Sequence, residues 1–289
     1  MKRQKAIAGA TNRCSESCFT QPTQKSCVSG RNRHFGLACA LLAALLYFCA
    51  GTPAVAQSSE PHGVRNVLLV HGAWADGSSW SKVIPLLEAK GLKVTAVQLP
   101  LTSLAEDVAT VKRAFALEDG PFLLIGHSYG GTVITEAGND PKVAGLVFVA
   151  AFAPDNGQTT LQLITANPTP VGPELRPTDG FFKLSAKGVF EDFGPDLPEV
   201  ERKVLFATQG PTAGAAFGAP ITAAAWRNKP SWFVIAGNDR IISPKLEEAE
   251  AEEMKAKSIT IPSSHLVMLS HPAEVAGFIE RAAHESGTD

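Results

Sequence analysis

Short apolar segments alternate with helix-like segments from residue 64 onward, and this alternation constrains the fold more than any other feature of the sequence. Each apolar segment is four to eight residues long and ends within two residues of a glycine or proline, as strands do before a turn. Most lack the polar alternation of a half-exposed strand, so we expect burial on both faces of a parallel sheet. The expected strands span residues 67–70, 93–99, 122–125, 145–152, 232–236 and 258–261.

Helices are expected after four of these strands and at the end of the sequence. Ser79 is a possible cap for the first helix, and Ser103 with Glu106 resembles a capping box at the start of the second. The expected helices span residues 78–89, 103–117, 129–137, 244–256 and 272–284. This order of elements predicts an α/β fold with a doubly wound, mostly parallel sheet.

Residues 156–228 break this rhythm between the fourth and fifth expected strands. The segment holds 8 of the 20 prolines of the sequence and 6 of the 12 phenylalanines that follow residue 56. It is interpreted as an inserted cap with an apolar lining. A small core inside the cap would account for the same phenylalanines.

The first 56 residues differ in composition from the rest and predict a signal peptide. A 16-residue apolar run, residues 35–50, follows Arg31 and Arg33 and precedes the small residues at positions 54–56. A basic flank, an apolar core and an A-x-A site are typical of a cleaved leader. The run is shorter than the roughly 20 residues of a spanning helix. We therefore expect a mature chain that begins at Gln57, forms one domain over residues 57–289, is periplasmic or secreted, and keeps no membrane anchor.

Cysteine usage and charge exclude several classes of site from that domain. All five cysteines lie within the first 49 residues, so the domain can hold no disulfide, thiolate metal site or cysteine nucleophile. Residues 57–289 carry 19 basic and 27 acidic side chains. This acidic balance argues against nucleic acid as a partner, because phosphate binding requires clustered basic charge. No metal is expected.

The sequence Gly126-His127-Ser128-Tyr129-Gly130 lies between an expected strand and an expected helix. A G-x-S-x-G motif in a strand–turn–helix setting is typical of a nucleophile elbow, in which the serine is exposed at the carboxyl edge of the sheet. The helix that follows would favour negative charge near the serine. Ser128 is therefore the predicted nucleophile, and a simple glycine-rich turn is the alternative.

A nucleophilic serine needs a base, and the base needs an orienting carboxylate. Asp239 follows the strand expected at 232–236, and His265 follows the strand expected at 258–261. The order serine, acid, histidine fits a triad on this kind of sheet. Two rivals remain open. His271 is a second candidate base, and Asp155 follows the preceding strand, although its Pro-Asp-Asn-Gly context favours a turn.

An oxyanion also needs two N–H donors. One is expected from the backbone of Tyr129, and the other from the loop after the first strand, with Ala73 preferred over Trp74. His71 is expected to hold this loop through hydrogen bonds. The side chain of Trp74 is a candidate substrate contact, as is that of Trp80, although ordinary packing explains both equally well.

Four motifs in order, HGAWADGSSW, GHSYGG, GNDRIISP and SHLVMLSHP, resemble those of the α/β-hydrolase superfamily over nearly all of residues 64–284. The first two are similar to the small-cap branch of plant methyl-ester esterases, hydroxynitrile lyases and bacterial esterase-like hydrolases. The resemblance implies a cofactor-free enzyme that acts on a carboxylic ester. It also implies nucleophile Ser128, acid Asp239, base His265, and oxyanion donors Ala73 and Tyr129.

These observations predict an exported serine carboxylesterase for small to medium esters, with a small-molecule ester as its partner. Two other functions remain open on the same fold. A hydroxynitrile-lyase-like enzyme would use the same triad as a base, and a non-catalytic receptor would keep the triad to bind a small molecule. The oligomeric state is left open.

Overall fold

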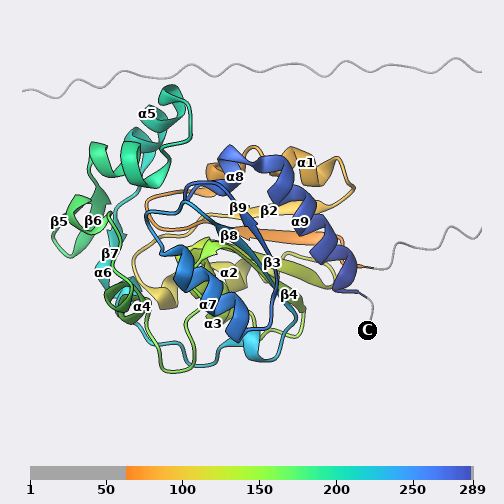
Figure 1. Cartoon of the computed structure of the whole chain (residues 1–289). Helices are drawn as coiled ribbons and strands as arrows, with labels where there is room; N and C mark the ends of the chain where they lie inside the picture. Colours follow the sequence, from red (N-terminus) through yellow and green to blue (C-terminus); the bar gives the residue numbers. More distant parts are fainter. Residues whose placement is uncertain (1–62, 288–289) are drawn as a thin grey trace, which may run out of the picture. The chain divides into compact units, whose positions relative to one another are not determined.

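The computed structural model describes residues 63–287, and its centre is a six-stranded sheet (Figure 1). The strand order is β2-β1-β3-β4-β8-β9, and every neighbouring pair is parallel. The strands are β1 (Asn66–Val70), β2 (Lys93–Val97), β3 (Phe122–Ser128), β4 (Val143–Ala151), β8 (Ser231–Ala236) and β9 (Lys257–Ile261). The predicted α/β fold with a parallel sheet is confirmed.

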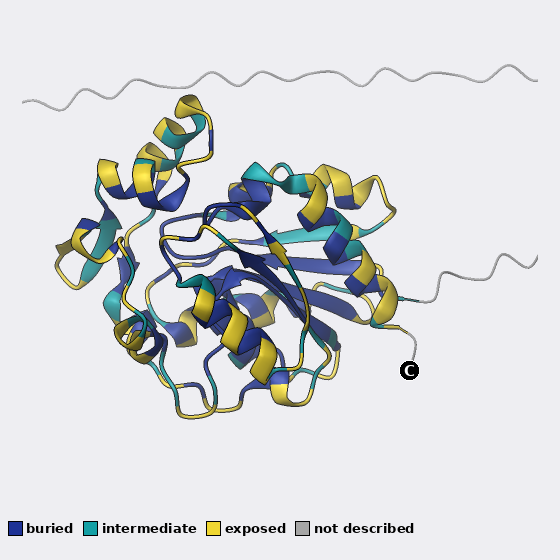
Figure 2. Ribbon diagram, in the orientation of Figure 1, coloured by how far each residue is buried: buried dark blue, intermediate teal, exposed yellow. Residues whose placement is uncertain are grey.

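Burial differs between the centre and the edges of the sheet. Every residue of β1 and β3 is buried, including the apolar runs 67–70 and 122–125 for which the sequence predicts it (Figure 2). β2 and β9 are the edge strands, and most of their residues are partly or fully exposed. Residues 93–99 alternate between polar and apolar side chains, so partial exposure of β2 agrees with the sequence. The expectation of burial on both faces is wrong for β9, which has a neighbour on one side only.

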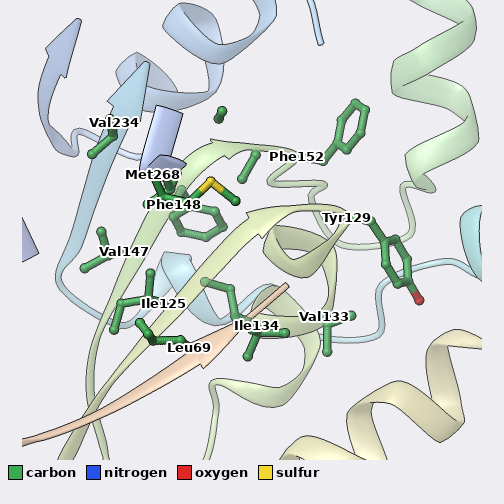
Figure 3. Packing of buried hydrophobic residues seen from close by; sticks show 14 of the residues in the cluster. Leu69, Ile125, Tyr129, Val133, Ile134, Val147, Phe148, Phe152, Val234 and Met268 are labelled. Carbon is green, nitrogen blue, oxygen red and sulfur yellow. The ribbon is translucent and has the colours of Figure 1, made fainter. Parts of the chain in front are cut away.

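Helices cover both faces of the sheet, with α1, α8 and α9 on one face and α2, α3 and α7 on the other (Figure 1). Their bounds are α1 (Ile84–Glu88), α2 (Leu104–Phe115), α3 (Tyr129–Ala137), α7 (Pro244–Glu253), α8 (Val267–Ser270) and α9 (Pro272–Glu285). Ser103 caps α2 by accepting a hydrogen bond from the Glu106 N–H at 3.2 Å, as predicted, but the return bond of a capping box, from the Ser103 N–H to the Glu106 side chain, is absent among the described residues. Figure 3 shows side chains of the central strands and of α3 packed into one core.

The helix expected over residues 78–89 is not continuous. A 3₁₀ turn, η1 (Gly77–Trp80), precedes the short α1. The cap of η1 is Asp76, whose carboxylate accepts from the Ser78 N–H at 2.7 Å, whereas the Ser79 hydroxyl donates to the Asp76 carbonyl at 2.8 Å. The prediction of Ser79 as the cap is therefore wrong. Pro85 lacks the N–H that a helix running through it would use, so α1 starts next to it.

The inserted segment folds as several short elements at one end of the sheet (Figure 1). Its three strands form a separate antiparallel sheet in the order β5-β6-β7. The elements are α4 (Thr160–Ala166), η2 (Gly172–Glu174), β5 (Leu175–Thr178), β6 (Phe181–Leu184), η3 (Gly188–Phe193), α5 (Glu199–Thr208), β7 (Thr212–Ala213), α6 (Gly214–Gly218) and η4 (Ala225–Arg227). We call residues 156–228 the cap.

The predicted signal peptide, residues 1–56, lies outside the described residues. Within residues 63–287, no helix is long and apolar enough to cross a membrane.

Candidate active site

Ser128 lies at the junction of β3 and α3, on a backbone that most residues avoid. Its φ of 56° and ψ of −126° are unusual for a residue with a side chain and are typical of strain held in place by surrounding structure. Two glycines allow the chain to approach this turn. A Cβ on Gly72 would lie 2.5 Å from the Ser128 Cβ, and a Cβ on Gly130 would lie 2.6 Å from the Val70 carbonyl oxygen. The loop after β1 therefore lies directly against the serine.

The two backbone N–H groups predicted as oxyanion donors, those of Tyr129 and Ala73, have no hydrogen-bond acceptor among the described residues. Tyr129 is the first residue of α3, so its N–H has no acceptor within that helix. The Ala73 N–H donates to no acceptor in the described loops and turns. The Trp74 N–H, the alternative oxyanion donor, instead donates to the Thr212 hydroxyl at 3.2 Å. The Trp74 N–H is thus engaged with the cap, and Ala73 and Tyr129 stay the predicted oxyanion donors.

A buried aspartate fixes the orientation of Tyr129. The Tyr129 hydroxyl donates to Asp107 Oδ2 at 2.8 Å, and the Leu101 N–H donates to Asp107 Oδ1 at 2.8 Å. Burial raises the pKa of Asp107, and the bonds from Tyr129 and Leu101 oppose that shift. Sequence reasoning missed Asp107, because nothing near position 107 indicates that α2 carries a fully buried carboxyl.

His265 and Asp239 meet inside the protein, and both side chains are fully buried. His265 Nδ1 lies 2.5 Å from Asp239 Oδ2. Asp239 Oδ1 accepts from the N–H groups of Ile241 at 2.7 Å and Ile242 at 3.0 Å. Because the carboxylate accepts the Nδ1 proton, the basic lone pair of a neutral ring is on Nε2. That nitrogen has no hydrogen-bond partner among the described residues.

His127 connects the serine turn to the His265 loop. Its Nε2 donates to the His265 carbonyl oxygen at 3.1 Å, and the two ring centroids are 4.6 Å apart. Burial holds the pKa of His127 well below its usual value, and the neighbouring His265 lowers it further. His127 is therefore neutral, and its hydrogen bond shows that the residue before Ser128 contacts the backbone of His265.

His71 holds the loop after β1, as the sequence predicts. Its Nε2 accepts from the Leu99 N–H at 2.9 Å, so Nδ1 carries the proton and donates to the Gly72 carbonyl at 2.8 Å. Burial lowers the pKa of His71, which keeps this arrangement in the neutral form.

A cavity of about 180 Å³ opens at Ser128. It has no charged side chain in its lining, and most of its lining is aliphatic or aromatic. The lining residues are Ala73, Trp74, Ser128, Phe152, Ile164, Thr165, Pro168, Thr169, Val171, Gly172, Leu175, Phe217 and Ile241. Only one of the six cap phenylalanines, Phe217, is among them, so the apolar lining comes mainly from aliphatic residues. Trp74 lines the cavity, whereas Trp80 is fully buried elsewhere.

The two rival residues lie apart from the His265–Asp239 pair. Asp155 forms an ion pair with Arg227, whose Nε lies 2.5 Å from Asp155 Oδ1, and its Oδ1 also accepts from the Asn156 N–H at 2.7 Å. That geometry fits the turn role expected of it. His271 precedes α9, and its Nδ1 contacts the Ser270 hydroxyl at 3.1 Å.

Two buried glutamates of α7 were also missed. Glu247 Oε2 accepts from the Ala236 N–H at 3.0 Å, and Glu250 Oε1 accepts from the Ala153 N–H at 2.9 Å. Burial raises the pKa of both, and that of Glu250 reaches about 8. The acidic sequence of α7 reads as a solvated face, and only the packing shows which two carboxyls point inward. No group of three or more metal-ligating side chains exists within residues 63–287.

Comparison with known proteins identifies the family to which the sequence is similar. Residues 67–278 match the model of the "Alpha/beta hydrolase family". The chain is 32% identical over 173 residues to Methylesterase 8 of Arabidopsis thaliana, an alignment that covers 53% of this chain and 63% of that protein. It therefore spans slightly less than two thirds of that relative.

Two pyrethroid hydrolases align over more of their length. The chain is 25% identical over 254 residues to the Pyrethroid hydrolase of Sphingobium wenxiniae, covering 74% of this chain and 85% of that protein. The crystal structure of a pyrethroid hydrolase from Sphingobium faniae superposes with a TM-score of 0.67 at 22% identity, covering 76% of this chain and 97% of the other. At that identity the superposition shows a shared fold.

Proposed function

This chain belongs to the α/β hydrolase family, and we propose that it is a serine carboxylesterase that works through an acyl-enzyme, a proposal that its similarity to a methylesterase and a pyrethroid hydrolase supports. The observation that carries the proposal is the buried hydrogen bond between His265 and Asp239, which leaves His265 Nε2 as an unpartnered basic nitrogen. Ser128 lies at the carboxyl end of β3, on the same edge of the parallel sheet as the loops of Asp239 and His265.

In the proposed reaction, Ser128 Oγ attacks the ester carbonyl while His265 Nε2 takes its proton. Asp239 accepts from Nδ1–H and stabilises the imidazolium that forms. The N–H groups of Ala73 and Tyr129 stabilise the oxyanion, and the N-terminus of α3 adds its positive end. His265 then gives the proton to the leaving alcohol. It next takes a proton from water, which attacks the acyl-enzyme, and gives that proton to Ser128 Oγ as the bond from Oγ to the acyl carbon breaks and the acid leaves.

The cavity supports small to medium, uncharged acyl groups. Its volume of about 180 Å³ is below the roughly 300–1,000 Å³ of sites for drug-sized ligands. A charged acyl group would be desolvated in the cavity without an opposite charge to compensate it, because no charged side chain lines the cavity. Trp74 is the proposed aromatic substrate contact.

Export is a further part of the proposal and depends on the sequence alone. The basic flank, the apolar run at 35–50 and the small residues at 54–56 support cleavage before Gln57 and release into the periplasm or medium.

A fluorophosphonate probe tests the nucleophile, because it reacts covalently with activated serines. We expect one label on the wild-type protein, located at Ser128 by mass spectrometry, and no label on Ser128→Ala. Ser79→Ala is the matched control, since Ser79 is also buried but hydrogen-bonds only the Asp76 carbonyl. Labelling that persists in Ser128→Ala, or a folded wild type that takes no label, would overturn the proposal.

A further inference from the structure

One carboxylate of the cap is bonded to the loop that carries His265. Asp196 lies between η3 and α5. Its Oδ2 accepts from the Ser264 N–H at 2.9 Å and the Ser263 hydroxyl at 3.1 Å, and its Oδ1 accepts from the Ser264 hydroxyl at 2.5 Å. Desolvation raises the pKa of Asp196, but these hydrogen bonds outweigh it and hold the pKa below its ordinary value. The carboxylate is therefore ionised at neutral pH.

The same cap segment also contacts the loop of the acid. Asp192 Oδ1 accepts from Arg240 Nε at 2.7 Å, and Arg240 directly follows Asp239. Between the two aspartates, the Phe193 ring lies 5.5 Å from the His265 ring, centroid to centroid. We call residues 192–196 the latch, because they contact the loops of both Asp239 and His265.

Ser264 depends on the latch more than Ser263 does. Ser263 has other partners, the Ser270 hydroxyl at 2.6 Å and the Ser264 carbonyl at 3.0 Å. The Ser264 N–H and hydroxyl bond only to Asp196 among the described residues, and Ser264 is 3% exposed. Removing the Asp196 carboxylate would leave two buried donors of Ser264 without an acceptor, which favours a shift of this loop.

We propose that Asp196 is a positioning residue for the base, so that His265 is held in its productive orientation only when the cap is seated. The inference rests on the proposed function and adds a role for the cap beyond enclosing the substrate. Asp196 binds the N–H and hydroxyl of Ser264, the residue before His265, while His127 binds the carbonyl of His265 itself. These contacts hold the backbone on both sides of His265, and the bond from Nδ1 to Asp239 then sets the direction of Nε2. A misplacement of about 1 Å in such a site can cost on the order of 100-fold in rate.

Asp196→Ala and Glu174→Ala form a matched pair of variants. Glu174 is also a cap carboxylate that accepts from a serine hydroxyl, that of Ser185, but its side-chain partners are all inside the cap. The measurements are kcat and KM on a short p-nitrophenyl ester, and the low-field NMR signal of the His265 Nδ1–H. A role limited to cap stability would affect both variants alike.

For Asp196→Ala we expect kcat to fall about 10- to 100-fold with KM nearly unchanged, and the low-field signal to shift or broaden. Asp196→Asn keeps an acceptor for the Ser264 N–H and should lose less. Glu174→Ala should retain both kcat and the signal. If Asp196→Ala matches Glu174→Ala in both readouts, or if its loss is in KM alone, the inference is wrong.

Two further proteins keep the outcomes separate. If Asp196→Ala does not fold, Ser264→Ala removes one of the same contacts, and an unchanged kcat and signal in that variant would overturn the inference. Ser128→Ala is measured alongside the wild type. Wild-type turnover that survives Ser128→Ala contradicts the proposed function, whereas a Ser128-dependent wild type with a fully active Asp196→Ala contradicts only the positioning role.

Discussion

At the scale of single residues, Asp239 and Asp155 follow neighbouring strands of the sheet, yet only Asp239 contacts a histidine. Asp239 is fully buried against His265, whereas Asp155 lies in an exposed turn paired with Arg227. Both positions fit the order of a triad, so the choice between them depends on which loop reaches the histidine. Which loop reaches the histidine is set by the spacing of the strands across the sheet.

Substitution of each aspartate by asparagine tests this difference. Asp239→Asn should fold but lose on the order of 10⁴ in kcat, because an amide favours the wrong tautomer of His265. Asp155→Asn should keep nearly full kcat. It should lose at most about 1 kcal/mol of stability, since exposed ion pairs contribute little. The measurements are kcat and melting temperature. Loss of activity in Asp155→Asn with activity kept in Asp239→Asn would reverse the assignment.

Glu250 gives a prediction for stability against pH. Its pKa is about 8 in the folded protein against 4.5 for the free group, because burial disfavours the charged form. The folded state therefore binds the extra proton between these values. The stabilisation that Glu250 gains from this proton is fully present below pH 4.5 and is lost as the pH rises through 8. Above that pH the free energy of unfolding no longer changes with this group, and the total loss is on the order of 4–5 kcal/mol.

Glu250→Gln should remove that part of the pH dependence while keeping an acceptor for the Ala153 N–H. Its stability relative to the wild type should rise between pH 5 and pH 8.5, apart from a constant offset. Urea denaturation at a series of pH values measures this difference. Glu247 is present in both proteins, so its own titration cancels to first order. Parallel stability curves would show that Glu250 titrates near its free value.

At the scale of elements, the β3–α3 turn brings three chain segments into contact. Gly130 lies where α3 starts, and a Cβ there would be 2.6 Å from the Val70 carbonyl oxygen and 2.7 Å from that of His71. These backbone atoms cannot yield without moving β1 and the loop that carries Ala73. The geometry of the serine turn and that of the proposed oxyanion donors are therefore linked through one glycine.

Gly130→Ala should therefore lower stability by about 1–3 kcal/mol and also reduce kcat. Gly218→Ala is the control, because a Cβ at Gly218 meets no atom within 4 Å and should change stability by less than about 0.5 kcal/mol. Chemical denaturation and kcat are measured for both. Equal stability of the two variants would show that β1 can move away without cost.

At the scale of the whole molecule, the cap determines what can reach Ser128. The cavity is closed by residues from α4 to β5 and by Phe217 of α6. We expect p-nitrophenyl esters of short to medium acyl chains to be hydrolysed faster than long ones. Ile164→Ala, which removes bulk from the lining, should move the optimum toward longer chains. A wild type that is fastest on long-chain lipids would contradict this expectation.

Export is also a property of the whole chain. The mature protein from the periplasm or medium should begin at or near Gln57. It should then contain no thiol, because all five cysteines lie within the first 49 residues. Intact-mass measurement and a thiol-specific reagent check both statements. Retention of residues 1–56 in the active protein would show that the leader interpretation is wrong.

The sequence by itself determined the kind of fold and the order of its elements. Apolar runs, turn residues and the capping serine Ser103 are local signals, and a strand or helix responds to its own residues first. The predicted helix 129–137 coincides with α3 for that reason. The G-x-S-x-G motif likewise located the turn of Ser128, because its glycines are needed where backbones approach closely.

Tertiary structure alone decided which distant residues meet. Asp196 and Ser264 are 68 positions apart, and no pattern near either indicates the other. The inward direction of Glu247 and Glu250, the contact of His127 with His265, and the aliphatic lining of the cavity depend in the same way on how the cap and α7 pack. The physical reason is that local propensity acts within a few residues, whereas burial and hydrogen bonding across the site are set only after the chain has folded.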